Sequence, residues 1–185
     1  MARIPYRDLA TAPEEVQQLV ATFAPLNIFR MLAHADTLLR GFGHLGAAIL
    51  GRATLDPRLR ELAILRVAVR SPAAYEWQQH VPIARASGAS DAEIAALERG
   101  DRDASCFGER ERALLRFTDE LLASPRASDE TLAAMRASFT DREVCEAIVT
   151  IGYYMMVARV LETTGVDLEV DSAATVTEMV ERVRR

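Results

Sequence analysis

The stretch from Asp56 to Gly88 constrains the fold more than any other part of the chain. Its first half, through Val69, is apolar on almost every side, and a helix with apolar residues all round is normally buried. Asp56 suits the N-cap of this helix and Pro57 its first position. Ser71 repeats the N-cap pattern for a second helix. The stretch therefore predicts two helices joined by a short break, with the first helix in the core.

Both expected helices carry side chains capable of chemistry. The first has Glu61 and Arg66, which cost free energy in a core unless they are paired. The second has Glu76 and His80 four residues apart, so both side chains lie on one face, one turn apart. Pro82 removes a backbone hydrogen bond, and we expect it to kink this helix after His80. A carboxylate, an imidazole and a buried arginine close together indicate a site rather than a scaffold.

Three segments of the sequence resemble the carboxymuconolactone decarboxylase family, which includes the AhpD-like alkylhydroperoxidases. They read RELAILRVA, YEWQQHVPIARASGASDAEIAAL and FTDREVCEAIVTIGYYMMVARVLETTGVDLEV. Their order and spacing fit the family over residues 38–170. The resemblance implies a homo-oligomer with sites near subunit boundaries.

The peroxidase branch of this family uses a glutamate, a Cys-x-x-Cys pair and a histidine on the following helix. Glu61 and His80 match that glutamate and histidine by spacing, but the thiol positions fall on Ala73 and Glu76. Tyr75 stands where the branch often has a histidine. Peroxide chemistry that depends on a disulfide cannot run without the thiols. The chain therefore resembles the thiol-less, decarboxylase-like branch.

Composition and length narrow the possible partners. The net charge of -5 argues against nucleic acid or an anionic membrane as the main partner. No segment approaches about 20 uninterrupted apolar residues, the length of a membrane span. The N-terminal sequence MARIPYRDLA lacks the apolar core of a signal peptide. We therefore expect a cytoplasmic protein that binds neither nucleic acid nor membrane.

The basic residues are unusual, because all 22 are arginines and the sequence contains no lysine. This excludes a lysine Schiff base and a P-loop lysine. Arginine suits bidentate recognition of carboxylates. We expect Arg66 and Arg70, with Tyr75, to bind a small acidic substrate.

The sequence gives little support for a metal site or for catalysis by a thiol. The Glu76–His80 pair supplies two ligands, whereas zinc needs three from the protein even in open sites. Cys106 and Cys145 are far apart in sequence, which argues against a local redox motif. We therefore expect no metal and no cofactor.

Each candidate residue also has a purely structural interpretation. His80 could be a core histidine, and Glu76 could form a surface pair with it. Glu61 could pair with an arginine such as Arg60 or Arg66. Arg66 itself could pair with an acid, Arg70 could bond carbonyls at its helix end, and Tyr75 could belong to the core.

Strand signals are nearly absent from the sequence, so we expect an all-α bundle of about six to eight helices. Capping boxes at Thr11, Ser90 and Thr140 mark helix starts. One helix is expected over 28–50, where the GxGxxG run from Gly41 is better explained by close helix packing than by a dinucleotide. A long apolar helix is expected over Thr140 to Thr164.

The chain is expected to form a single domain over residues 1–185. Within it, residues 38–170 are the family-like core, 1–37 a helical extension and 171–185 a tail with a last helix. The helices over 56–69 and 140–164 carry more apolar surface than one small domain is expected to hide. Such surface favours a homo-oligomer.

Three functions fit this sequence. The first is a cofactor-free lyase or isomerase acting on a lactone acid or a related aromatic-degradation intermediate. In this reaction His80 would transfer the proton, Glu76 would orient the imidazole and Glu61 would relay protons. The second is an AhpD-like alkylhydroperoxidase or antioxidant protein. The third is an oligomeric relative that binds a ligand without turning it over.

Overall fold

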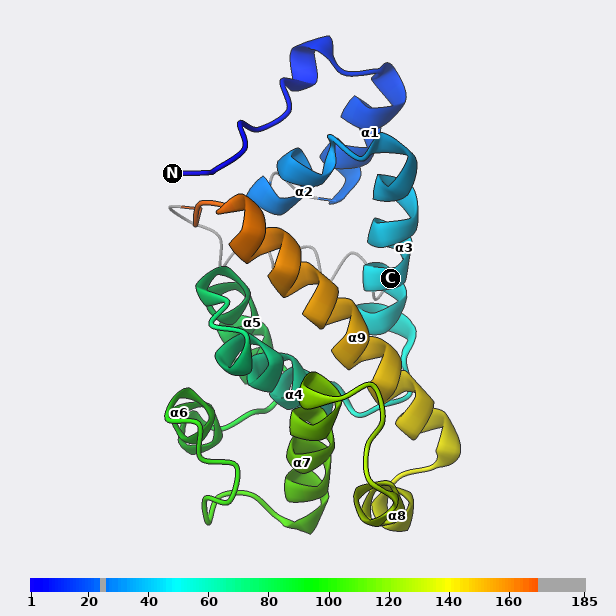
Figure 1. Ribbon diagram of the computed structural model, residues 1–185, viewed down its shortest axis with the longest axis vertical. Helices are drawn as coiled ribbons and strands as arrows, with labels where there is room; N and C mark the ends of the chain where they lie inside the picture. Colours follow the sequence, from blue (N-terminus) through cyan, green and yellow to red (C-terminus); the bar gives the residue numbers. More distant parts are fainter. Residues whose placement is uncertain (24–25, 170–185) are drawn as a thin grey trace. The chain divides into compact units, whose positions relative to one another are not determined.

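The structure is a computed structural model that describes residues 1–23 and 26–169 (Figure 1). These residues form nine α-helices, one short 3-10 helix and no strand, which confirms the all-α prediction. The expected helix over 28–50 is two helices, α2 (Asn27–Leu32) and α3 (Asp36–Arg52). The expected last helix over 173–184 lies outside the described residues.

The chain forms two compact units. Among the described residues, unit 1 contains Met1–Arg52 together with residues 159–169, and unit 2 contains Ala53–Ala158. The long helix α9 (Asp141–Thr164) belongs partly to each unit.

Unit 1 contains the 3-10 helix (Leu9–Thr11), α1 (Glu14–Phe23), α2 and α3. The rings of Phe23 and Phe29 stack with their centroids 5.1 Å apart. A Cβ atom on Gly43 would overlap the ring of Phe23. Gly43 therefore lets α1 and α3 approach closely, as the sequence favoured, and the glycine run does not follow a strand.

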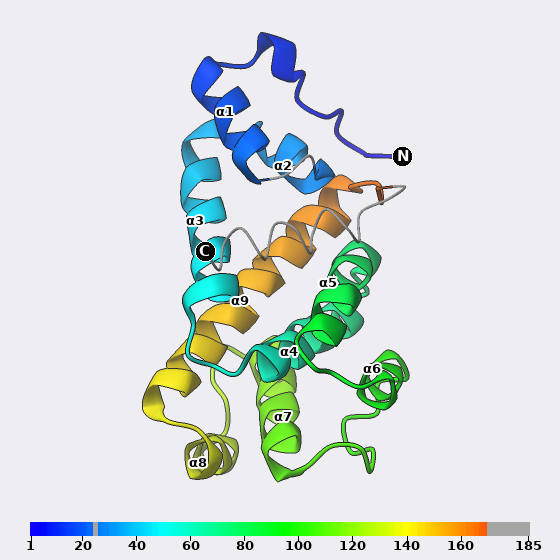
Figure 2. The same cartoon turned by 180° about the vertical axis from the view of Figure 1, so that it is seen from behind.

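Unit 2 is built around α4 (Pro57–Arg70), and α5 (Ala74–Ala86) and α7 (Glu109–Ala123) lie against it in both views (Figures 1 and 2). The helix α6 (Asp91–Glu98) also packs on α4, and α8 (Asp129–Ser138) packs on α7. Every residue of α4 from Leu59 to Ala68 is buried. The prediction that this helix lies in the core is confirmed.

Most predicted helix starts are correct. Asp56 accepts a hydrogen bond from the backbone N–H of Leu59, and the Ser90 capping box is complete. Thr140 and Glu143 cap α9 in the same reciprocal way. The prediction for Ser71 is wrong, because Ser71 ends α4 and α5 begins after Ala73 without a side-chain cap.

Among the described residues, α9 alone has the length and apolar composition of a membrane span. Half of its most apolar window is nevertheless buried within the protein. A core helix of a soluble protein has the same properties, so they are weak evidence for a membrane segment.

Candidate functional site

The contact between α4 and α5 brings Glu61 and His80 together inside unit 2. Nδ1 of His80 lies 2.7 Å from Oε2 of Glu61. The Glu61 side chain has no exposed surface and that of His80 is 9 % exposed. An ionised carboxylate only accepts hydrogen bonds, so Nδ1 carries the hydrogen and donates it. The other ring nitrogen, Nε2, is left for exchange of a proton.

Arg60 holds the same carboxylate from its other side. Its Nε and Nη2 atoms both donate to Oε1 of Glu61, each at 3.0 Å. Arg60 is itself almost completely buried, at 1 % exposure. A buried carboxylate needs a compensating charge and hydrogen bonds. Arg60 supplies both and leaves Oε2 to His80.

Tyr154 on α9 completes the surroundings of the imidazole. Its ring meets that of His80 edge-on, with centroids 4.8 Å apart and planes at 88°. Burial raises the pKa of Tyr154 well above its usual value, and the negative charges of Glu61 and Glu76 raise it further. Tyr154 is therefore a neutral phenol that can donate a hydrogen bond. Burial also raises the pKa of the adjacent Tyr153.

Glu76 and Tyr75 lie in the first turn of α5 and are both buried. Glu76 is close enough for its charge to act on Tyr154. The prediction that Glu76 orients the imidazole needs correction, because Nδ1 of His80 donates its hydrogen bond to Glu61. The i,i+4 spacing puts two side chains on one face but does not make them the nearest partners.

The two arginines expected to bind a substrate carboxylate contact Asp119 instead. Arg66 makes a bidentate pair with Asp119, at 2.8 Å for each bond, and its Nη1 donates to the carbonyl of Gly100. Arg70 approaches the same carboxylate at 3.6 Å with half of its side chain exposed. For Arg66 the structural interpretation is the one observed: this guanidinium ties α4 to α7 and to the loop after α6.

Sequence reasoning missed two members of this cluster. Arg60 was considered only as one possible partner of Glu61, and Tyr154 was not singled out as a site residue. A charged residue beside a buried glutamate was a usable signal for Arg60. Nothing local in the sequence indicates that Tyr154 contacts His80, because that contact depends on how α9 packs against α5.

The cysteines and potential metal ligands are not part of this cluster. Cys106 and Cys145 are both free and exposed. Cys145 is exposed although its helix is apolar. Within residues 1–23 and 26–169, no three His, Cys, Asp or Glu side chains gather closely enough to hold a metal ion.

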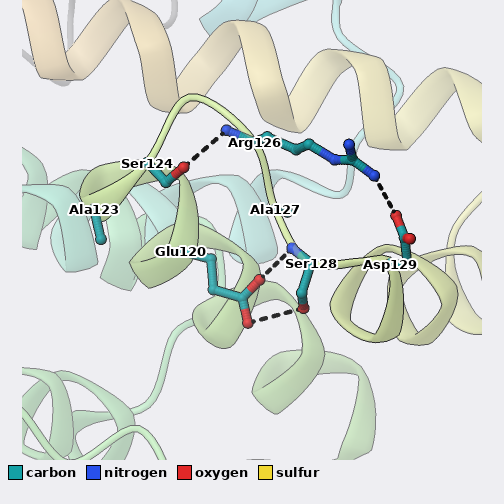
Figure 3. Close-up of a pocket in the computed structure, with 7 residues that line it drawn as sticks. All are labelled: Glu120, Ala123, Ser124, Arg126, Ala127, Ser128 and Asp129. Carbon is teal, nitrogen blue, oxygen red and sulfur yellow. Dashed lines mark hydrogen bonds and ion pairs between the residues drawn. The ribbon is translucent and has the colours of Figure 1, made fainter.

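An open pocket at the junction of α7 and α8 lies apart from the predicted site residues (Figure 3). Glu120 lines this pocket and accepts hydrogen bonds from the hydroxyl of Thr131 and the backbone N–H of Ser128, at 2.6 and 2.7 Å. These bonds lower the pKa of Glu120 to about 2. The Glu120 carboxylate therefore holds the loop between α7 and α8 in place. The lining residues are Glu120, Ala123, Ser124, Arg126, Ala127, Ser128 and Asp129.

Comparison with known proteins agrees with the resemblance seen in the sequence. Residues 36–120 match the model of the carboxymuconolactone decarboxylase family. No curated protein gives a significant match.

Several solved structures share the fold. One is an uncharacterized peroxidase-related protein from Ralstonia eutropha JMP134, described as an alkylhydroperoxidase AhpD core. It is 21 % identical with a TM-score of 0.79, covering 100 % of this chain and 97 % of its own. A peroxidase-related protein from Silicibacter sp. TM1040 is 19 % identical with a TM-score of 0.79, covering 95 % of each chain.

The debrominase Bmp8 is a third similar structure. It is 16 % identical with a TM-score of 0.72, covering 94 % of this chain and 96 % of its own. A cysteine-to-alanine variant of Bmp8 was solved in complex with 2,3,4-tribromopyrrole. Residues 36–120 thus match the carboxymuconolactone decarboxylase family model, and the solved structures show that the chain has the AhpD-like fold.

Proposed function

We propose that this protein is a cofactor-free lyase or isomerase that moves a proton to or from a carbon atom of a small acidic substrate. One observation carries the proposal: the buried 2.7 Å contact between Oε2 of Glu61 and Nδ1 of His80. A histidine held in this way is a suitable general acid or base, because its second nitrogen can take up or release a proton.

In an isomerisation, Nε2 of His80 takes a proton from a carbon next to a carbonyl. The electron pair of the broken C–H bond moves onto the carbonyl oxygen and forms an enolate. Glu61 stabilises the imidazolium that results, and the neutral phenol of Tyr154 is the proposed donor to the enolate oxygen. The imidazolium exchanges its proton with solvent and then delivers a proton to a different carbon.

In a decarboxylation, the C–C bond to the carboxylate breaks first and its electron pair forms the same type of enolate. Carbon dioxide leaves, and His80 in its protonated form delivers a proton to the carbon that lost it. Both reactions use the same atoms of the protein. They differ in whether His80 begins as a base or as an acid.

The acidic nature of the substrate is inferred from the family match, because Arg66 is engaged by Asp119. Lactone acids and related aromatic-degradation intermediates are the class that this match favours. Tyr75 and Glu76, buried in the first turn of α5, are the proposed additional substrate contacts.

Peroxidase or debrominase activity is a weaker candidate, although similar structures include peroxidase-related proteins and a debrominase. The family's thiol positions hold Ala73 and Glu76 in this sequence. The two cysteines present are exposed, one in a loop and one on α9. Neither is placed to replace a Cys-x-x-Cys pair.

A screen of lactone acids and aromatic-degradation intermediates tests the proposal. Turnover is followed by NMR for the wild type and for the Cys106→Ser/Cys145→Ser double variant, beside a thiol-dependent peroxide assay. We expect both proteins to turn over one of the acids at similar rates and to reduce no peroxide. Peroxide reduction that the double variant loses would contradict the proposal, and ligand binding without turnover would favour the non-catalytic alternative.

A further inference from the structure

The two oxygens of Glu61 serve different partners. Oε1 accepts two hydrogen bonds from Arg60, and Oε2 faces Nδ1 of His80. All three side chains are nearly inaccessible to solvent, so water does not compete for these contacts. The position and the charge of Oε2 therefore depend on the pairing of Oε1 with Arg60.

We infer that Arg60 is a positioning residue that sets the tautomer of His80 through Glu61. By pairing with Oε1, Arg60 keeps the buried carboxylate ionised, because an uncompensated buried charge is costly. An ionised Oε2 can only accept, so the imidazole must present its hydrogen at Nδ1. The neutral ring then carries a bare Nε2, which is the base required by the proposed isomerisation.

Loss of the guanidinium charge should reverse this hydrogen bond. In an Arg60→Gln variant, Glu61 would be a buried carboxylate without its cation, and it is expected to take up one proton from solvent. The neutral acid would then donate its O–H to Nδ1. The ring stays neutral but its hydrogen moves to Nε2, so the imidazole can no longer begin the reaction as a base at that atom.

The tautomer can be measured without knowledge of the substrate, since nitrogen-15 NMR distinguishes protonated from bare ring nitrogens. The chain has three histidines. The His80 signals are assigned by their loss in a His80→Gln variant. The spectra are recorded at a pH where the ring is neutral, with circular dichroism of each variant to confirm that it is folded.

Arg66→Gln is the matched control, because Arg66 is also a buried arginine on α4 but pairs with Asp119. We expect the Nδ1–H tautomer in the wild type and in Arg66→Gln, and predominantly the Nε2–H tautomer in Arg60→Gln. Arg60→Lys keeps the positive charge and should largely retain the wild-type tautomer.

A wild type that shows the Nε2–H tautomer would overturn the inference even if Arg60→Gln failed to fold. A folded Arg60→Gln variant with an unchanged tautomer would overturn it as well. The role of the tautomer in catalysis rests on the proposed function, but the NMR measurement of the tautomer does not. The test therefore stands even if no substrate is found. A wild type with the Nε2–H tautomer would overturn the role of Arg60 without excluding turnover.

Discussion

His80 and Glu61 are in contact although 19 positions separate them in the sequence. Family spacing was enough to single out both residues. Family spacing did not identify which carboxylate hydrogen-bonds to the imidazole, because the local i,i+4 pattern also made Glu76 a candidate. The choice is made by the packing of α4 against α5, which depends on the whole apolar surface of both helices.

The role of His80 can be tested by substitution. Removal of a positioned general acid or base typically costs 10²–10⁴-fold in rate, so His80→Ala should lose at least ~100-fold in turnover while it stays folded. Glu61→Gln should lose more than Glu76→Gln, because Glu61 makes the hydrogen bond to the ring. The Glu61→Gln/His80→Ala double variant should be little worse than His80→Ala, since the two act as a unit. Additive losses in the steady-state rates would contradict this account.

Tyr154 is the proposed donor to the developing enolate oxygen. Tyr154→Phe keeps the ring that packs against His80 and removes only the hydroxyl. Loss of one such donor elsewhere costs about 10²–10³-fold in kcat, and we expect a loss of about that size here. Tyr153→Phe is the matched control and should retain most activity. Equal rates for Tyr154→Phe and the wild type would remove Tyr154 from the mechanism.

At the scale of helices, local signals predicted most boundaries. Asp56, Ser90 and Thr140 start helices as expected because an N-cap bonds to backbone groups only three residues away. Ser71 has the right residue type but instead closes α4. The expected helix over 28–50 breaks between Leu32 and Asp36, where the sequence offers no glycine or proline as a signal.

The pairing of Arg66 also lies beyond local prediction. Its partner Asp119 is 53 positions away on α7, and the third hydrogen bond of Arg66 goes to the carbonyl of Gly100 in the loop after α6. The sequence established only that a buried arginine needs a partner. Tertiary packing decides whether that partner is a substrate or, as observed, another helix.

Glu120 provides a pH-dependent contribution at the junction of α7 and α8. Its folded pKa of about 2 lies below the ordinary value of 4.5, so the stabilisation is fully present above about pH 4.5 and is lost as the pH falls toward 2. Glu120→Gln should therefore lower the melting temperature at neutral pH. The difference from wild type should shrink between about pH 4.5 and 2.

Thermal unfolding across this pH range checks the prediction. The exposed Glu98→Gln on α6 is a suitable control and should change the melting temperature little. A difference between wild type and Glu120→Gln that grows as the pH falls would show that the assigned role of Glu120 is wrong.

At the scale of the whole molecule, the two apolar helices behave differently. Every residue of α4 from Leu59 to Ala68 is buried, so α4 offers no reason to expect a partner subunit, contrary to the prediction from its sequence. The helix α9 does expose apolar side chains. Ile148, Val149 and Met156 are each more than 40 % exposed, on the same face as Cys145 and Gly152.

This exposed surface supports the prediction of a homo-oligomer. We expect light scattering to give a mass that is a multiple of 20.4 kDa at micromolar concentration. Ile148→Glu should weaken the assembly if this face takes part in it, whereas a substitution on α8 such as Ala134→Glu should not. A wild-type monomer under these conditions would contradict the prediction.

The central claim is that Nε2 of His80 exchanges a proton with a carbon atom of the substrate. The most direct measurement is turnover in deuterium oxide, followed by NMR, with an acid identified by the screen. The wild type should place deuterium on the carbon that is protonated in the product, and His80→Ala should do so at least ~100-fold more slowly. Equal incorporation by a folded His80→Ala variant, or wild-type turnover that leaves every carbon-bound position free of deuterium, would contradict the account.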